Sequence, residues 1–152
     1  MQTRPIPSSG EALPVIGCGT YVGFDVGNNS DKLKALADVI RTLRDAGGKV
    51  FDTSPMYGRA EAVLGELLAD APDPKRTFIA TKVWTRGRQA GITQMERSFA
   101  LLKVKHIDLM QVHNLVDWKR ILRPCGAGSR TAASVTWASR ITPRAPMTSW
   151  KP

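Results

Sequence analysis

The chain has 152 residues, 42% of them hydrophobic and 23% charged, which suits one globular domain with a hydrophobic core and leaves no apolar run long enough to cross a membrane. The N-terminal residues lack the apolar stretch of a secretory signal, and two cysteines, Cys18 and Cys125, are too few for a disulfide framework, so we expect a cytoplasmic protein. The net charge of +9 would suit a nucleic-acid partner, but the chain shows no zinc-ligand spacing, no helix-turn-helix pattern and no interleaved aromatic and basic residues, so we expect neither nucleic-acid binding nor a metal site.

The first predicted elements are a strand and a helix joined by a loop. Residues 13–21 form a short apolar strand, and the glycine- and asparagine-rich residues 22–30 form the loop. Ser30 is expected to cap the helix that follows. The apolar residues of that helix recur at helical spacing until Gly47, which ends it.

Three further strands then alternate with two helices. The strands cover residues 49–54, 77–84 and the stretch that ends at His113, and the helices cover about 60–70 and about 91–103. This alternation predicts an α/β fold with parallel strands and right-handed crossover helices. A doubly wound sheet and half of an eight-stranded barrel both fit the order. No GxGxxG follows the first strand, so the dinucleotide-binding motif of the open sheet is missing.

Three successive predicted strands end in ionisable residues. These are Asp52, Lys82 and His113, and Tyr57 follows Asp52 on the loop that leaves the same strand. A single such residue is more often a surface or structural group than a catalyst, but three in succession favour a functional site. Because the carboxyl ends of parallel barrel strands meet at one rim, we expect these four side chains to converge there.

The four side chains together suit proton transfer to a carbonyl oxygen. An ammonium beside a phenol favours the phenolate and so makes the phenol a stronger acid. Asp52 would keep Lys82 charged and in place, so that Tyr57 could protonate the oxygen. His113 would donate a hydrogen bond to the same oxygen and orient it. The hydride must come from a cofactor, because no side chain supplies one.

Three stretches of the sequence resemble the aldo-keto reductase family. FDTSPMYGRAEAVLGELL resembles the family's block with an Asp and a Tyr around a Ser-containing turn, ATKVW resembles the block with the catalytic Lys, and SFALLKVKHIDLMQVHN resembles the block that delivers the catalytic His. The resemblance spans roughly residues 10–120 and implies the N-terminal half of a (β/α)8 TIM barrel. It also implies reduction of aldehydes or ketones with NADPH as the hydride donor.

The resemblance assigns roles to individual residues. It makes Asp52, Tyr57, Lys82 and His113 the catalytic tetrad. The stretch LPVIGCGTY resembles the family's first barrel strand, which implies that Thr20 and Tyr21, together with Asp52, lie near the nicotinamide ribose of the cofactor. Trp84 would line the substrate pocket, and the alternative for Trp84 is a packing residue at the barrel rim.

The last part of the chain differs from the rest. Residues 1–120 hold 17 basic residues beside all 13 acidic ones, whereas residues 121–152 hold five basic residues, no acidic residue and no sustained periodicity. A disordered basic tail is one interpretation. The other is a shifted reading frame, because reading from the third base of each codon permits LRxWKPDGRIRYLGVTHY from Pro124 onward, similar to the run that follows the family's fourth strand. We therefore hypothesise a half-barrel over 1–120 followed by an out-of-frame tail.

The length of the resembling part limits the expected activity. Complete barrels need about 250 residues, and the residues with which the family grips the amide, pyrophosphate and 2′-phosphate of the cofactor come mainly from later strands. We therefore predict a truncated, inactive member of a reductase family. The alternative is a non-catalytic fragment, or a half-barrel that assembles with a partner.

Overall fold

The computed structural model describes residues 1–69, 77–121 and 136–137. Its central sheet contains four parallel strands that lie side by side in chain order, β3 (Gly17–Gly19), β4 (Val50–Asp52), β5 (Phe78–Val83) and β6 (Leu109–Val112). A fifth strand, β7 (Thr136–Trp137), pairs with β6 in the antiparallel direction. The rest of the predicted tail, 122–135 and 138–152, lies outside the described residues.

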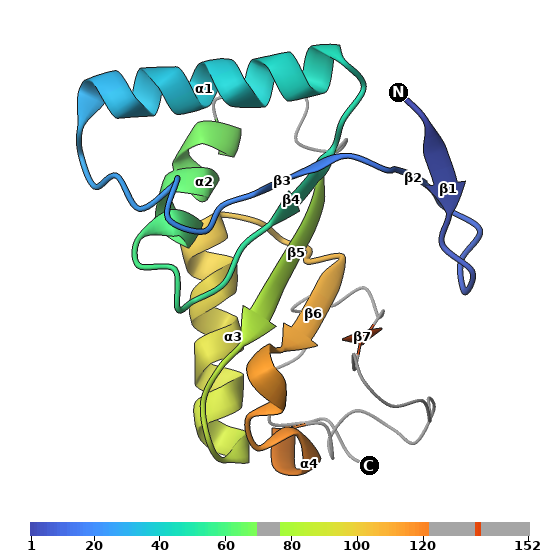
Figure 1. Ribbon diagram of the computed structural model, residues 1–152. Helices are drawn as coiled ribbons and strands as arrows, with labels where there is room; N and C mark the ends of the chain where they lie inside the picture. Colours follow the sequence, from blue (N-terminus) through green and yellow to red (C-terminus); the bar gives the residue numbers. More distant parts are fainter. Residues whose placement is uncertain (70–76, 122–135, 138–152) are drawn as a thin grey trace.

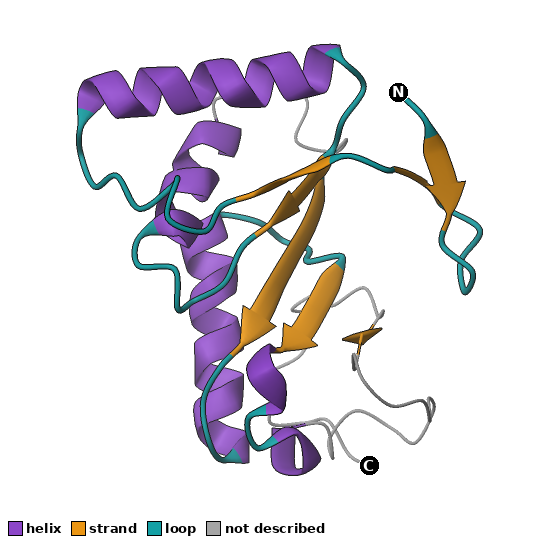
Figure 2. Cartoon of the chain, viewed as in Figure 1, coloured by secondary structure: helices purple, strands orange, loops and turns teal. Residues whose placement is uncertain are grey.

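Helices connect the parallel strands on one side of the sheet. The three crossovers contain α1 (Ser30–Asp45), α2 (Ala60–Ala69) and α3 (Arg88–Leu102). Figures 1 and 2 show all three helices on the same face, while the opposite face carries no helix in the described part of the chain. A 3-10 turn, η2 (His113–Leu115), and the short α4 (Trp118–Ile121) follow β6. The predicted alternation of parallel strands and helices is thus confirmed. None of the described helices is both long and apolar enough to span a bilayer.

The prediction for the N-terminal strand was wrong. Residues 13–21 do not form one strand: β2 (Ala12–Pro14) pairs with β1 (Thr3–Pro5) in an antiparallel hairpin, and β3 begins only at Gly17. Pro14 has no N–H to donate to a ladder, so it ends β2 instead of continuing it. The hairpin lies apart from the sheet in Figure 1, beside the face that carries no helices.

Two helix starts also differ from the prediction. Asn29, not Ser30, caps α1, because its side-chain oxygen accepts a hydrogen bond from the backbone N–H of Lys32 at 3.0 Å. Helix α3 begins at Arg88, a turn earlier than predicted, directly after Gly87 with its φ of +84°. The predicted end of α1 is correct, since Gly47 adopts a φ of +84° that residues with a side chain rarely take.

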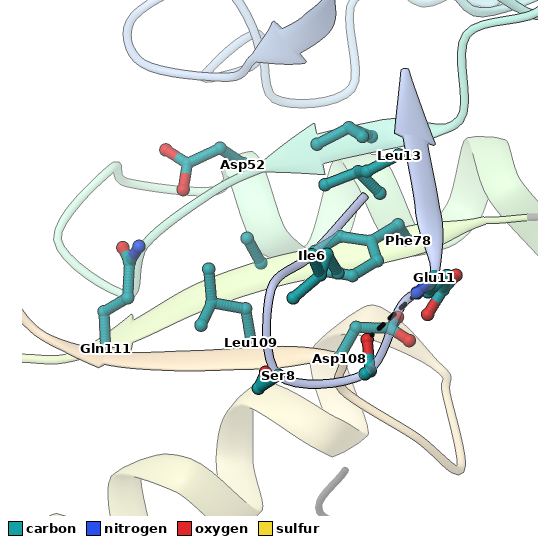
Figure 3. A pocket seen from close by; sticks show the side chains of 12 residues that line it. Ile6, Ser8, Glu11, Leu13, Asp52, Phe78, Asp108, Leu109 and Gln111 are labelled. Atoms are coloured by element: carbon teal, nitrogen blue, oxygen red, sulfur yellow. Dashed lines mark hydrogen bonds between the residues drawn. The ribbon is translucent and has the colours of Figure 1, made fainter. Parts of the chain in front are cut away.

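The alternation of side chains along the strands separates a filled face from an open one. Phe51, Ile79 and Met110 are buried against the apolar side chains of the three helices, and these form the core. The neighbouring strand residues point the other way. They and the N-terminal hairpin line a cavity of about 690 Å³, in which Asp52 lies at one end and Asp108 at the other (Figure 3).

Candidate active site

The carboxyl ends of β4 and β5 hold an ion pair. Nζ of Lys82 donates a hydrogen bond of 2.7 Å to Oδ2 of Asp52 and another of 2.8 Å to the backbone oxygen of Thr53. The Lys82 side chain is 12% exposed and the Asp52 side chain 43%. The two acceptors therefore fix the position of the ammonium, while the carboxylate of Asp52 keeps contact with solvent.

Tyr57 lies on the loop between β4 and α2, above this ion pair. Its backbone N–H donates to the carbonyl of Ser54 at 3.0 Å, which makes a tight turn out of the residues that follow β4. The ammonium of Lys82 is 5.3 Å from the centre of the Tyr57 ring. The ring of His113 meets the Tyr57 ring edge-on, with 5.9 Å between the centres. The structure thus brings Asp52, Tyr57, Lys82 and His113 together, and their catalytic roles stay predictions.

His113 directly follows β6 and begins η2. Burial, and secondly the positive charge of Lys82, lower the pKa of His113 below its usual 6.5, while the carboxylate of Asp52 acts in the opposite direction. The ring is therefore neutral at neutral pH. Its Nδ1 lies 3.0 Å from Oγ of Ser54, a completely buried residue for which the sequence predicted no role.

The three remaining predicted site residues lie in different environments. The side chain of Thr20 is fully buried, and its hydroxyl has no hydrogen-bond partner within the described ranges. Tyr21 is 68% exposed, and its ring centre is 5.0 Å from that of Tyr57. Trp84 is 42% exposed, and Gln94 holds it by accepting from its backbone N–H and donating to its carbonyl. The ring of Tyr21 thus lies beside that of Tyr57, and Trp84 presents an exposed ring two residues after Lys82. The predicted cofactor and substrate contacts stay predictions.

A buried carboxyl group lies behind the site, on the helix side of the sheet. Glu61 in α2 is only 2% exposed, and its Oε1 accepts a 2.7 Å hydrogen bond from the hydroxyl of Thr81, the residue before Lys82. Burial raises the pKa of Glu61, although hydrogen bonds from Thr81 and Ser98 and the charges of Arg97 and Lys82 oppose this. Glu61 thus ties α2 to the strand that delivers the lysine.

We expect Glu61→Gln to change how stability depends on pH. Because the folded-state pKa of Glu61 is raised, the stability that this carboxyl group provides is present below its unfolded-state pKa and is lost as the pH rises through the folded value. Glutamine keeps an acceptor oxygen for Thr81 and does not ionise. The melting temperature of the unsubstituted chain should therefore fall relative to that of Glu61→Gln as the pH rises above about 4.5.

Circular dichroism melts at a series of pH values measure this difference. Glu66→Gln, at an exposed position of the same helix, is the matched control and should follow the unsubstituted chain. Parallel curves for Glu61→Gln and the unsubstituted chain would contradict the expectation.

Solved structures share this arrangement of strands and helices. A putative aldo-keto reductase from Pseudomonas aeruginosa superposes with a TM-score of 0.66 at 30% sequence identity, over 80% of this chain and 49% of that chain. An aldo-keto reductase from Klebsiella pneumoniae, solved in complex with NADPH, superposes with a TM-score of 0.61 at 25% identity, over 74% and 40% of the two chains. The described fold is therefore an α/β half-barrel, as the sequence predicted.

The sequence comparisons give the family. Residues 15–127 match the model of the Aldo/keto reductase family, so the chain belongs to this family of oxidoreductases. The NADPH-dependent codeinone reductase 1-2 of Papaver somniferum is 28% identical over 131 residues, which cover 78% of this chain and 39% of that protein. The chain thus spans less than half the length of these relatives.

Proposed function

We propose that this chain carries the proton-transfer half of an NADPH-dependent carbonyl reductase. The observation that carries the proposal is the 2.7 Å ion pair of Lys82 and Asp52 next to the rings of Tyr57 and His113. Strands β4 and β5, the turn after β6 and one loop bring these groups together, although Asp52 and His113 are 61 positions apart in the sequence. A cluster of ionisable side chains from separate elements is typical of a functional site.

Each residue of the cluster has a role in protonating a carbonyl oxygen. NADPH, when bound, supplies the hydride. The hydroxyl of Tyr57 gives its proton to the oxygen, and the ammonium of Lys82 stabilises the phenolate that remains. Asp52 holds this ammonium in place through its 2.7 Å hydrogen bond. His113, as a neutral ring, donates a hydrogen bond that orients the substrate oxygen.

Asp52, Tyr21 and Trp84 are the candidates for contacts with the reacting end of the cofactor and with the substrate. The side chain of Asp52 is 43% exposed, which leaves its carboxylate able to accept a hydrogen bond from a ribose hydroxyl. The exposed ring of Tyr21 offers a flat surface for a nicotinamide, and Trp84 offers apolar surface for an aldehyde or ketone. Thr20 is enclosed, so Tyr21 and Asp52 are the better candidates for the cofactor.

We expect the 152-residue chain alone to show little or no turnover. Its tetrad is assembled, but the described residues supply only the reacting end of a cofactor site, and a cofactor held at one end binds weakly. The measurement is NADPH oxidation with a simple aldehyde, followed by absorbance. Reduction that the chain catalyses and that Tyr57→Phe abolishes would overturn this expectation, while it would support the role of Tyr57.

The second candidate function is a non-catalytic half-barrel that assembles with a partner. The observation in its favour is the outer edge of β3, which pairs with no further strand in the described part of the chain. Exposed apolar side chains flank this strand in the sequence, at Val15, Ile16, Tyr21 and Val22. Such an edge invites pairing with a further strand. Size-exclusion chromatography combined with NADPH titration separates the candidates: a monomer that binds the cofactor favours the reductase, and a defined dimer or large aggregates without binding favour the fragment.

For residues 121–152 we propose that a shifted reading frame has replaced the continuation of the barrel. The composition of this segment supports the proposal, since it combines five basic residues with no acidic residue, and the shifted frame permits a run similar to that of the family. The nucleotide sequence across codons 115–155 tests it. An uninterrupted frame without the implied continuation would show that the tail is native.

A further inference from the structure

The hydroxyl group of Ser54 is enclosed within the candidate active site. Ser54 lies between Asp52 and Tyr57 on the loop after β4, and it is 0% exposed. Its Oγ is 3.0 Å from Nδ1 of His113 and 3.4 Å from the backbone nitrogen of Met56. Within residues 1–69 and 77–121, these two nitrogens are the hydrogen-bond partners of the hydroxyl.

The hydrogen-bond roles of the three groups follow from their chemistry. The backbone N–H of Met56 can only donate, so the Ser54 oxygen is the acceptor in that contact. The hydroxyl hydrogen needs an acceptor of its own, because buried donors in folded proteins are paired. Nδ1 of His113 is the acceptor within reach, and it can accept only when it carries no proton.

Because the ring of His113 is neutral, it carries one proton, and the position of this proton decides which ring nitrogen can donate a hydrogen bond. Burial and the charge of Lys82 lower the pKa of His113, so that the ring carries a single proton at neutral pH. With Nδ1 accepting from Ser54, that proton resides on Nε2, on the other side of the ring from Nδ1. A proton on Nδ1 would instead leave Nε2 with a lone pair, which cannot donate to a carbonyl oxygen.

We propose that Ser54 is a positioning residue that donates a hydrogen bond to Nδ1 and thereby holds His113 as the neutral tautomer with its proton on Nε2. The inference rests on the proposed function, because an Nε2–H donor is what His113 needs to orient a carbonyl oxygen. Ser54 acts through His113 and does not touch the substrate. Its contribution is to fix which ring nitrogen donates before a substrate arrives.

NMR of the ring nitrogens in the isotopically labelled full chain tests the inference without cofactor or substrate. The chain has two histidines, so in the His106→Gln variant the remaining histidine signals all come from His113. At a pH above the titration of the ring, we expect Nδ1 to show the shift of an unprotonated nitrogen that accepts a hydrogen bond, and Nε2 that of a protonated one. A proton on Nδ1 in the unsubstituted chain overturns the inference.

Two serine variants complete the experiment. Ser54→Ala should shift the His113 signals toward the tautomer mixture of a free imidazole, and unchanged signals would also overturn the inference. Ser98→Ala is the matched control, because Ser98 is also buried, at 1% exposed, but its hydroxyl contacts the backbone of Gln94 and the carboxyl group of Glu61 and not His113. If Ser54→Ala does not fold, the spectrum of the unsubstituted chain still decides. The NMR measurement does not depend on catalysis. The role of Ser54 can therefore be tested even if the chain reduces no carbonyl compound.

Discussion

Replacing Gly65 with alanine should lower the free energy of unfolding by about 3 kcal/mol, near the upper end of the usual cost of overpacking. Gly65 is buried where α2 crosses α3. A Cβ atom at this position would lie 2.8 Å from Cα of Leu102 and would also collide with the carbonyl oxygen of Leu101. These are backbone atoms, which cannot rotate away, so the two helices would have to separate.

Urea unfolding followed by circular dichroism measures this loss as a lower midpoint at an unchanged slope. Gly91→Ala in α3 is the matched control. A Cβ atom there would come no closer than 3.5 Å to Ile121, an ordinary contact, and alanine favours the helix by roughly 1 kcal/mol over glycine. We therefore expect Gly91→Ala to keep or raise the midpoint. Equal midpoints for Gly65→Ala and the unsubstituted chain would mean that α2 and α3 do not approach so closely.

The close crossing of α2 and α3 matters for the site because α2 begins three residues after Tyr57. The same helix contributes Glu61, whose carboxyl group accepts from Thr81 beside the catalytic lysine candidate. A displaced α2 would therefore move the tyrosine loop and β5 relative to each other. Stability and site geometry are coupled through this one helix.

The sequence was sufficient to predict the convergence of the tetrad. Short apolar strands that alternate with helices define parallel strands, and parallel strands deliver their last residues to one edge. Asp52 and Lys82 lie at the ends of β4 and β5, and His113 directly follows β6. These positions depend on local patterns, namely apolar runs and the breaks that follow them. They are therefore visible in a single sequence.

The partners of these residues were not predictable in the same way. Ser54 contacts a ring 59 positions further along the chain, and Glu61 resembles any acidic residue in the first turn of a helix. Their importance comes from burial, which depends on the packing of whole elements. The hairpin of β1 and β2 was also missed, since each strand has three residues and ends in proline, a residue more typical of turns. Together with strand residues, this hairpin lines the cavity on the face of the sheet that carries no described helix.

In a chain whose reading frame is restored after residue 120, Tyr57→Phe should lower kcat for carbonyl reduction by about 10²- to 10⁴-fold, the range that a positioned general acid contributes. Phenylalanine keeps the ring that contacts Tyr21 and His113 and removes only the hydroxyl that donates the proton. NADPH oxidation at saturating aldehyde measures kcat. The KM for NADPH should change little, because the hydroxyl acts on the substrate oxygen.

Two further variants decide whether the loss belongs to Tyr57 as the acid. Lys82→Met should approach the same loss, since it removes the ammonium that lies 5.3 Å from the Tyr57 ring and stabilises the phenolate. Tyr21→Phe removes the other phenol of the chain, which is 68% exposed, and should cost much less in kcat. Equal losses for the two tyrosine variants, or full turnover by Tyr57→Phe, would place the proton donor elsewhere. The ion pair of Lys82 and Asp52 would then serve only to join β4 and β5.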